Sequence, residues 1–269
     1  EYRLALEAPS SFAARMLTDV AGDFGLGPLA EVAAAAHPWG DLAPHAPATP
    51  TASMCLHERV LRGEDLTGVE LPGPDPLELP LCLEPWEPAY RLAHYRTDAA
   101  EFPSPPPGPT GAATEVASGA KPLARNGVVR TLRDLVHPWT AEGDAVAVAV
   151  TGDVRAAIGA VDGPEVWLAE VELTTALAWL GWAGASGGAH GRRRGAAAGR
   201  LDTWMVLSEL ADLGEEWPPN SHEMGAYAET LRWFVWDAMG IGSTGWTLRI
   251  AVEDPNRNLA YALSAFDPS

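Results

Sequence analysis

The clearest pattern along the chain is the alternation of apolar and polar residues near its C-terminal end. Every second residue of 246–252 is apolar, and the alternation resumes over 259–265. The residues between the two runs, 254–258, are rich in Asp, Asn and Pro, which favour turns. Strict alternation is typical of half-buried strands, so residues 246–266 are predicted to form a β-hairpin. A third alternating run, 144–150, predicts a further strand.

Helical patterns dominate the remainder of the chain. The longer predicted helices cover residues 10–36, 51–63, 126–136, 173–213 and 220–239. The last of them begins at Asn220, a good N-cap with Glu223 three residues later. Residues 165–173 fit either a strand or a helix. The sequence therefore predicts an α+β fold that is rich in helices, with antiparallel strands segregated from them.

Proline and glycine divide the chain into three parts. Prolines are dense over 71–109, and a Gly/Ala/Thr/Ser stretch follows. We expect an N-terminal helical and Pro-rich region over 1–100, a linker or surface loop over 101–122, and a C-terminal α+β region over 123–269. The two outer regions form either separate domains or one, since 269 residues suit both arrangements.

The chain is strongly acidic, with a formal net charge of −18. Broad binding to nucleic acid or to anionic membranes needs a basic surface, so neither partner is expected. Cys55 and Cys82 form no disulfide framework, and residues 1–5 do not have the character of a signal peptide. The longest apolar run, 173–185, is shorter than the ~20 residues of a membrane span. We therefore expect a cytoplasmic protein.

The most distinctive segment of the chain is residues 184–200, which combine glycine with arginine. On a helical wheel at about 100° per residue, its six glycines fall within about one third of the circumference and continue an apolar face. These residues are Gly184, Gly187, Gly188, Gly191, Gly195 and Gly199. Each glycine costs a helix about 1 kcal/mol, so such a ridge must pack closely against another helix, a second subunit or a flat ligand. This interpretation favours a binding or assembly protein that contacts a protein partner or self-associates as a homo-oligomer.

The alternative is a glycine-rich loop that presents cations to an anion. Backbone N–H groups freed by glycine, together with arginine side chains, suit a phosphate, a nucleotide or an acidic peptide. The candidate anion-binding residues are His190, Arg192, Arg193, Arg194 and Arg200. This hypothesis describes a protein or enzyme that binds a phosphorylated or carboxylated compound. The same arginines could instead pair with acidic residues of the chain itself.

Other motifs give weaker signals. Residues 184–188 match G-x-S-x-G, the nucleophile elbow of α/β hydrolases, which needs a strand before Ser186 and a helix after it. Asp202 or Asp212, with His222, would have to complete such a serine hydrolase. No HExxH or P-loop motif occurs, so we predict no catalytic residue, metal site or cofactor. The 11 tryptophans are interpreted as core residues.

Three short motifs in the C-terminal third carry a family resemblance. They are the run 185–192, the pair Gly199-Arg200, and the Val-Glu-Asp-Pro sequence at 252–255. In these motifs the chain resembles an actinobacterial family of unknown function. Since the family brings no activity, the resemblance implies no catalytic residue.

Overall fold

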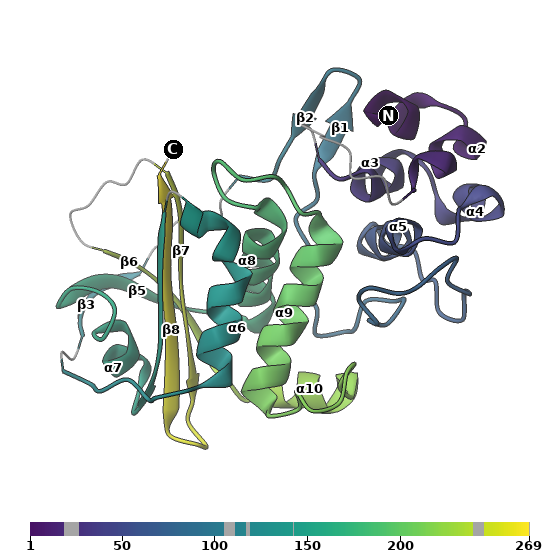
Figure 1. Ribbon diagram of the computed structural model, residues 1–269. Helices are drawn as coiled ribbons and strands as arrows, with labels where there is room; N and C mark the ends of the chain where they lie inside the picture. The colour runs from purple at the N-terminus through teal and green to yellow at the C-terminus, as the bar shows by residue number, and fades with distance from the viewer. Residues whose placement is uncertain (19–26, 105–110, 117–118, 142, 239–244, 269) are drawn as a thin grey trace.

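The protein consists of a small helical lobe beside a larger part built on a β-sheet (Figure 1). The structure is a computed structural model that describes residues 1–18, 27–104, 111–116, 119–141, 143–238 and 245–268. The mixture of helices and antiparallel strands confirms the predicted α+β class.

A six-stranded antiparallel sheet, in the order β3-β5-β6-β7-β8-β4, is the centre of the larger part. Its strands are β3 (Ala112–Glu115), β4 (Asp144–Thr151), β5 (Glu165–Val171), β6 (Arg232–Ala238), β7 (Gly245–Asp254) and β8 (Leu259–Pro268). The predicted C-terminal hairpin is confirmed as β7–β8, whose register pairs Asp254 with Leu259. The ambiguous segment 165–173 begins as a strand, β5. Strand β4 lies at one edge of the sheet, which matters for the site described below.

Helices cover both faces of this sheet. One face packs against α6 (Gly127–Leu135), α8 (Leu173–Ser186) and α9 (Ala196–Ala211), and the other against α7 (Val154–Ile158). The turn η3 (His137–Ala141) follows α6, and α10 (Ser221–Ala228) contacts α9. The side chains of Asn126, Asp153 and Asn220 cap the helices that follow them, which confirms the predicted cap at Asn220. Among the helices that the structure describes, none has the length and apolarity that crossing a bilayer requires.

The predicted helix over 220–239 is wrong beyond its first turns. Helix α10 ends at Ala228, and residues 232–238 form β6. Trp233 packs in the core on the α8 side of the sheet, whereas Phe234 packs in the core on the α7 side. A central strand covered on both faces is apolar without alternation, and over this length its pattern resembles that of a buried helix.

The predicted continuous helix over 173–213 is also wrong, and with it the helical ridge at 184–200. Helix α8 ends at Ser186, and α9 begins only at Ala196. Gly187, Gly188 and Gly195 have φ angles of 75°, 89° and 98°, which lie in the region that glycine tolerates and other residues avoid. These glycines therefore end one helix and precede the next, because their conformational freedom favours a loop over a helix that each of them would destabilise.

The N-terminal lobe, defined here as residues 1–71 with the hairpin 94–101, has a hydrophobic core of its own. Its elements are α1 (Tyr2–Glu7), α2 (Ser10–Ala13), η1 (Ala14–Met16), α3 (Leu29–Ala36), α4 (Trp39–Leu42), η2 (Ala43–His45), α5 (Pro50–Leu61), β1 (His94–Arg96) and β2 (Ala99–Glu101). The predicted helix over 10–36 corresponds to α2, η1 and α3, and residues 19–26 within it lie outside the described residues.

The chain crosses between the lobe and the larger part more than once. Leu77, Leu79, Trp86 and Tyr90 are buried in the same core as α8 and α9, although they precede the hairpin 94–101. Within the expected linker 101–122, β3 pairs with β5, while residues 105–110 and 117–118 lie outside the described residues. The lobe is therefore attached to the larger part both through the chain and through the contacts described next.

Candidate functional site

The loop between α8 and α9, residues 187–195, brings Arg193 against a carboxylate of the N-terminal lobe. Its guanidinium donates two hydrogen bonds to Glu31, from Nε to Oε2 (2.8 Å) and from Nη2 to Oε1 (2.7 Å). The side chains are 3% and 0% exposed. Tyr95 Oη donates to Glu31 Oε2 (2.6 Å), and the backbone N–H of Ala196 donates to Oε1 (3.2 Å). Glu31 thus has four donors in a dry environment.

A second buried carboxylate, Glu58, lies beside Glu31 at the N-terminus of α9. Its Oε1 accepts a hydrogen bond from the N–H of Ala197 (2.7 Å), and its Oε2 accepts one from Arg62 Nη1 (2.7 Å). The two carboxylates satisfy successive N–H groups at the positive end of the helix dipole.

The two carboxyl groups have pKa values shifted in opposite directions. Burial raises the pKa of Glu58, and the negative charge of Glu31 raises it further, more than Arg62 and the Ala197 N–H lower it. Burial also opposes ionisation of Glu31, but Arg193 and Tyr95 outweigh it, so the pKa of Glu31 lies below its ordinary value.

Arg200, in the first turns of α9, pairs with a different carboxylate. It donates to Glu87 from Nε (2.8 Å) and Nη2 (2.6 Å), and both side chains are fully buried. Its remaining donors reach backbone carbonyls of residues 80 and 82. Trp204 Nε1 (3.1 Å) and Tyr90 Oη (2.8 Å) also donate to Glu87. This network ties the segment 80–90 to α9.

The remaining predicted cations have their own surroundings. Arg194 pairs with Asp202 and donates to the carbonyl oxygen of Gly184 (3.0 Å). Arg192 lies on the exposed side of the loop, and the His190 ring contacts the carbonyl oxygen of Pro268. The structure therefore does not bring the predicted arginines together around one anion: Arg193, Arg194 and Arg200 each pair with a separate carboxylate of this chain.

The predicted contact glycines pack against this chain itself. A Cβ at Gly199 would meet the carbonyl oxygen of Gly181 and the backbone of Ala185, so α8 and α9 approach closely at this point. A Cβ at Gly184 would lie 2.6 Å from Asp202 Oδ2, and one at Gly195 would lie 2.8 Å from Glu58 Oε1. The other three are equally confined: a Cβ at Gly187 would meet the carbonyl oxygen of Arg192, one at Gly191 would meet that of Gly187, and one at Gly188 would meet Asp267 and Trp139.

Ser186 does not have the surroundings of a hydrolase nucleophile. It is the last residue of α8, so a helix precedes it where the elbow needs a strand. Its hydroxyl is buried and donates to the carbonyl oxygen of Ala183 (2.9 Å). Asp202 is engaged by Arg194, and His222 lies in α10. Residues 184–188 therefore do not form the nucleophile elbow on which the serine hydrolase hypothesis rests.

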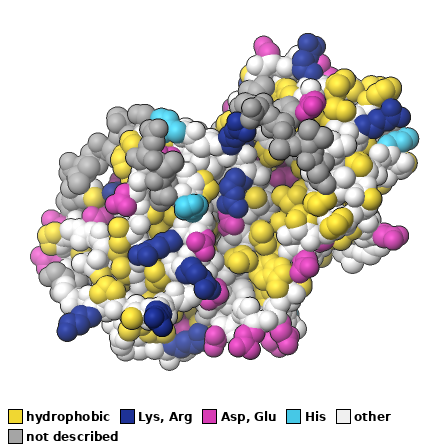
Figure 2. All heavy atoms as spheres, viewed as in Figure 1, with side chains coloured by type: hydrophobic (Ala, Val, Ile, Leu, Met, Phe, Trp, Pro, Cys, Tyr) yellow, Lys and Arg dark blue, Asp and Glu magenta, His cyan; other side chains and the backbone are white. Residues whose placement is uncertain are grey.

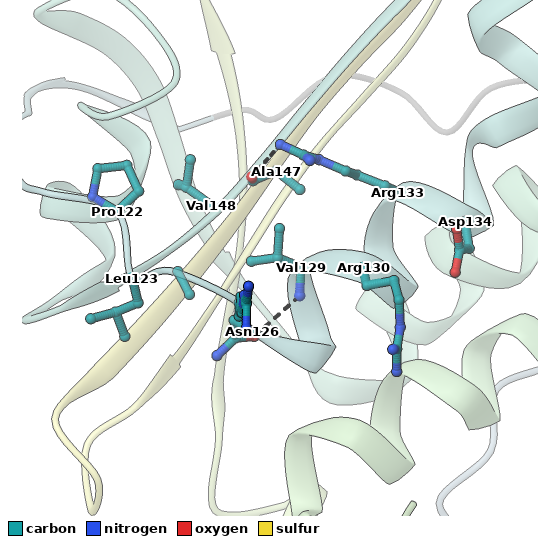
Figure 3. Close-up of a pocket in the computed structure, with 11 residues that line it drawn as sticks. Pro122, Leu123, Asn126, Val129, Arg130, Arg133, Asp134, Ala147 and Val148 are labelled. Carbon is teal, nitrogen blue, oxygen red and sulfur yellow. Dashed lines mark hydrogen bonds between the residues drawn. The ribbon is translucent and has the colours of Figure 1, made fainter.

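A cavity of about 430 Å³ opens between α6 and the edge strand β4 (Figure 3). It is lined by Pro122, Leu123, Arg125, Asn126, Val129, Arg130, Arg133, Asp134, Ala147, Val148 and Ala149. Three arginines and an asparagine thus surround a largely aliphatic wall. Among these lining residues none has a hydroxyl, thiol or imidazole side chain. Its arginine, asparagine and aliphatic side chains equip the cavity to bind a ligand.

Local structure explains how the arginines reach this cavity. Asn126 accepts a hydrogen bond from the N–H of Val129 (3.2 Å) and so starts α6. Arg130 and Arg133 follow on the exposed face of the helix, opposite its buried leucines. Arg125 precedes the cap with a φ of 53°, a left-handed conformation that costs energy in a residue other than glycine.

The edge of β4 forms the second wall of the cavity. Arg133 Nη2 donates to the carbonyl oxygen of Ala147 (3.3 Å), and the N–H of Leu123 donates to that of Ala149 (2.8 Å). Both carbonyl groups therefore point away from β8. In an antiparallel strand the N–H of a residue points to the same side as its C=O, so the N–H of Ala147 also faces this edge.

Electrostatics distinguish this cavity from the remainder of the acidic chain. Residues 116–133 contain four cations, Lys121 and the three arginines, and no acidic residue. Lys and Arg side chains gather on the surface over α6 in Figure 2. The nearby acids are Asp134, on the rim, and Glu209, which pairs with Arg130 at 3.3 Å while that arginine is 71% exposed. This site was not predicted from the sequence, although the acid-free stretch is visible there.

Comparison with known proteins places the chain in a family. The model of DUF6183, a family of unknown function, matches residues 1–269. The chain belongs to this family. The resemblance to a family of unknown function, seen in motifs of the C-terminal third, is thus confirmed, and the match covers the whole sequence. Neither a curated protein nor a solved structure matches the chain.

Proposed function

We propose that the protein binds a small organic anion in the cavity between α6 and β4. The observation that carries this proposal is that Arg125, Arg130 and Arg133 all line one cavity in a chain with a net charge of −18. A local cluster of cations in an acidic protein concentrates anions at one place and repels them elsewhere.

The lining of the cavity indicates the chemistry of its ligand. Arginine side chains bind carboxylate and phosphate groups through two parallel hydrogen bonds, which makes either group a suitable head. Leu123, Val129 and Val148 provide an aliphatic wall between the arginines, which suits an apolar body. The ligand class is therefore a carboxylate or phosphate ester with a hydrocarbon portion of a few atoms.

Anion binding is preferred to an assembly function for a specific reason. The glycines that suggested a contact with a second subunit pack against residues of the same chain. We also propose that the protein acts in the cytoplasm, which the two free cysteines support: Cys55 is buried and unpaired, and Cys82 has no disulfide.

Calorimetric titration tests the proposal with phosphate, phenyl phosphate, hexanoate and benzoate at constant ionic strength. We expect heat of binding from the members that have a hydrocarbon group, and a weaker response to phosphate alone. Replacing Arg125 and Arg133 together by alanine should weaken binding at least about tenfold, because each charge-assisted hydrogen bond contributes about 1.5–3 kcal/mol.

Arg3→Ala is the matched control, since Arg3 is exposed and lies in the N-terminal lobe. It should leave the titration unchanged. Equal affinity in the double variant and in wild type, or no binding of any member of the panel, would refute the proposal.

A further inference from the structure

We infer that the N-terminal lobe is held on the larger part by a polar latch and opens from it as a rigid unit. This inference is independent of the proposed anion site. The latch consists of Glu31 and Glu58 on the lobe side, and of Arg193 with the N-terminus of α9 on the other side. In Figure 1, α3 and α5 lie beside the N-terminal end of α9 and the loop before it.

The first support is that the lobe has a separate core. The buried apolar residues of α1–α5 pack against one another, and the residues that enclose the sheet form a different cluster. At the seam, Leu61 is buried in the larger core and Met54 contacts both. Opening therefore exposes Leu61, Met54 and Leu81, which pack across the seam, and keeps the other residues of each core together.

The second support is the polarity of the contacts across the seam. Arg193 reaches Glu31, the N–H groups of α9 reach Glu31 and Glu58, and one backbone hydrogen bond joins Leu66 to Leu81 (2.9 Å). The geometry of a buried ion pair is directional. When its partners separate, however, hydration of both charges offsets much of the lost attraction. A seam of this kind specifies one closed arrangement and separates without unfolding either side.

The third support is the way Gly195 fits the seam. Its φ is 98°, and a Cβ added to it would lie only 2.8 Å from Glu58 Oε1, so the position has room for glycine alone. Such a Cβ would also lie 3.2 Å from Pro28 Cγ, which belongs to the lobe. A methyl group here would push the lobe away without removing a charge.

The chain crosses the seam at residues 72–76 and again on either side of the hairpin 94–101, where Trp182 Nε1 donates to the carbonyl oxygen of Pro103 (3.0 Å). Between Leu71, which packs in the lobe core, and Leu77, in the larger core, five residues cross the seam. Tyr95 and the hairpin 94–101 stay with the lobe through Tyr2, whose hydroxyl donates to the carbonyl oxygen of Arg96 (2.6 Å). The moving unit is therefore the lobe as defined above.

Hydrogen exchange of the wild-type protein, read residue by residue, provides the first test. If the lobe opens as a unit, the amides of Ala196 and Ala197 should exchange through an opening of lower free energy than the amides of β7 and β8. Amides inside α3 and α5 should still exchange slowly, because the lobe itself stays folded. If Ala196, Ala197 and the β7–β8 amides exchange through one common opening, the latch is an ordinary part of a single cooperative fold and the inference fails.

Two variants provide the second test. Glu31→Gln leaves Arg193 without an anionic partner, and Gly195→Ala introduces the clash, so both should accelerate exchange at Ala197 roughly a hundredfold and increase the radius of gyration. Protection of β7–β8 should remain. Gly40→Ala, in open space on α4, is the control and should change neither. Unchanged exchange at Ala197 in both variants, or loss of β7–β8 protection along with it, would overturn the inference; the wild-type measurement decides if a variant does not fold.

Discussion

At the scale of single residues, Glu31 and Glu58 are neighbouring buried carboxyl groups in contrasting environments. Burial opposes ionisation of Glu31, but Arg193 and Tyr95 favour its ionised form and lower its pKa. Burial and the charge of Glu31 raise the pKa of Glu58, so its ionised form is held at a cost. The same seam thus contains one carboxyl group whose surroundings favour ionisation and one whose surroundings oppose it.

This contrast predicts a pH-dependent effect of Glu58→Gln. A group whose pKa is raised on folding stabilises the fold at pH values below its ordinary pKa, about 4.5. That contribution is lost as the pH rises through the raised pKa. Glutamine keeps an acceptor for the Ala197 N–H and carries no charge. The variant should therefore gain stability relative to wild type as the pH rises from about 4 to about 7.

Urea denaturation of both proteins across this pH range measures the difference. Glu31 has the opposite linkage. Its contribution to stability is present at pH values above its ordinary pKa and is lost as the pH falls through its lowered pKa. A difference between Glu58→Gln and wild type that stays constant, or that decreases with rising pH, contradicts the assigned environment of Glu58.

At the scale of elements, the α8–loop–α9 unit shows glycine in two roles. Gly187, Gly188 and Gly195 adopt backbone conformations that end or precede a helix. Gly199 lies within α9, where its missing side chain lets the helix approach the backbone of α8. The close contact that the sequence analysis inferred from small residues is thus present, but it lies between two separate helices of one chain.

Gly199→Ala tests this contact. Alanine is the better helix former by about 1 kcal/mol, yet its methyl group would overlap the carbonyl oxygen of Gly181 and approach Ala185. Overpacking of this kind costs about 1–3 kcal/mol, so a net loss of stability and a lower Tm are expected. Gly40→Ala, on an exposed helix with open space, should be neutral or stabilising. A higher Tm for Gly199→Ala would show that the helices do not meet at this glycine.

At the scale of the whole molecule, the two charged features lie in different places and depend on different elements. The latch joins the N-terminal lobe to α9, whereas the cavity is formed by α6, β4 and the segment before α6. Effects of substitutions at sites that share no partners are usually additive. Binding and opening are therefore expected to be separable.

Separability predicts that Glu31→Gln retains the anion affinity of wild type, measured by the same titration. Arg125 and Arg133 should keep their positions, because their surroundings belong to the larger part. The reverse also holds: the double arginine variant should show wild-type exchange at Ala196 and Ala197. A change in affinity of more than about threefold in Glu31→Gln would mean that the seam and the cavity are coupled.

Features that depend on near neighbours were predictable from the sequence. The β7–β8 hairpin follows from alternation with a period of two, and the caps at Asn126, Asp153 and Asn220 act on N–H groups two or three residues away. The basic stretch that lines the cavity is likewise visible in the sequence, where no acidic residue interrupts it.

Other features were decided by tertiary structure alone. Strand β6 is apolar on both faces because helices cover both sides of the sheet. The residues of this segment alone do not distinguish a doubly covered strand from a buried helix. Arg193 meets Glu31 across 162 positions, and Arg200 meets Glu87 across 113. Local hydrogen bonds are specified within a few residues, whereas the partner of a buried charge is specified only when the whole chain has folded around it.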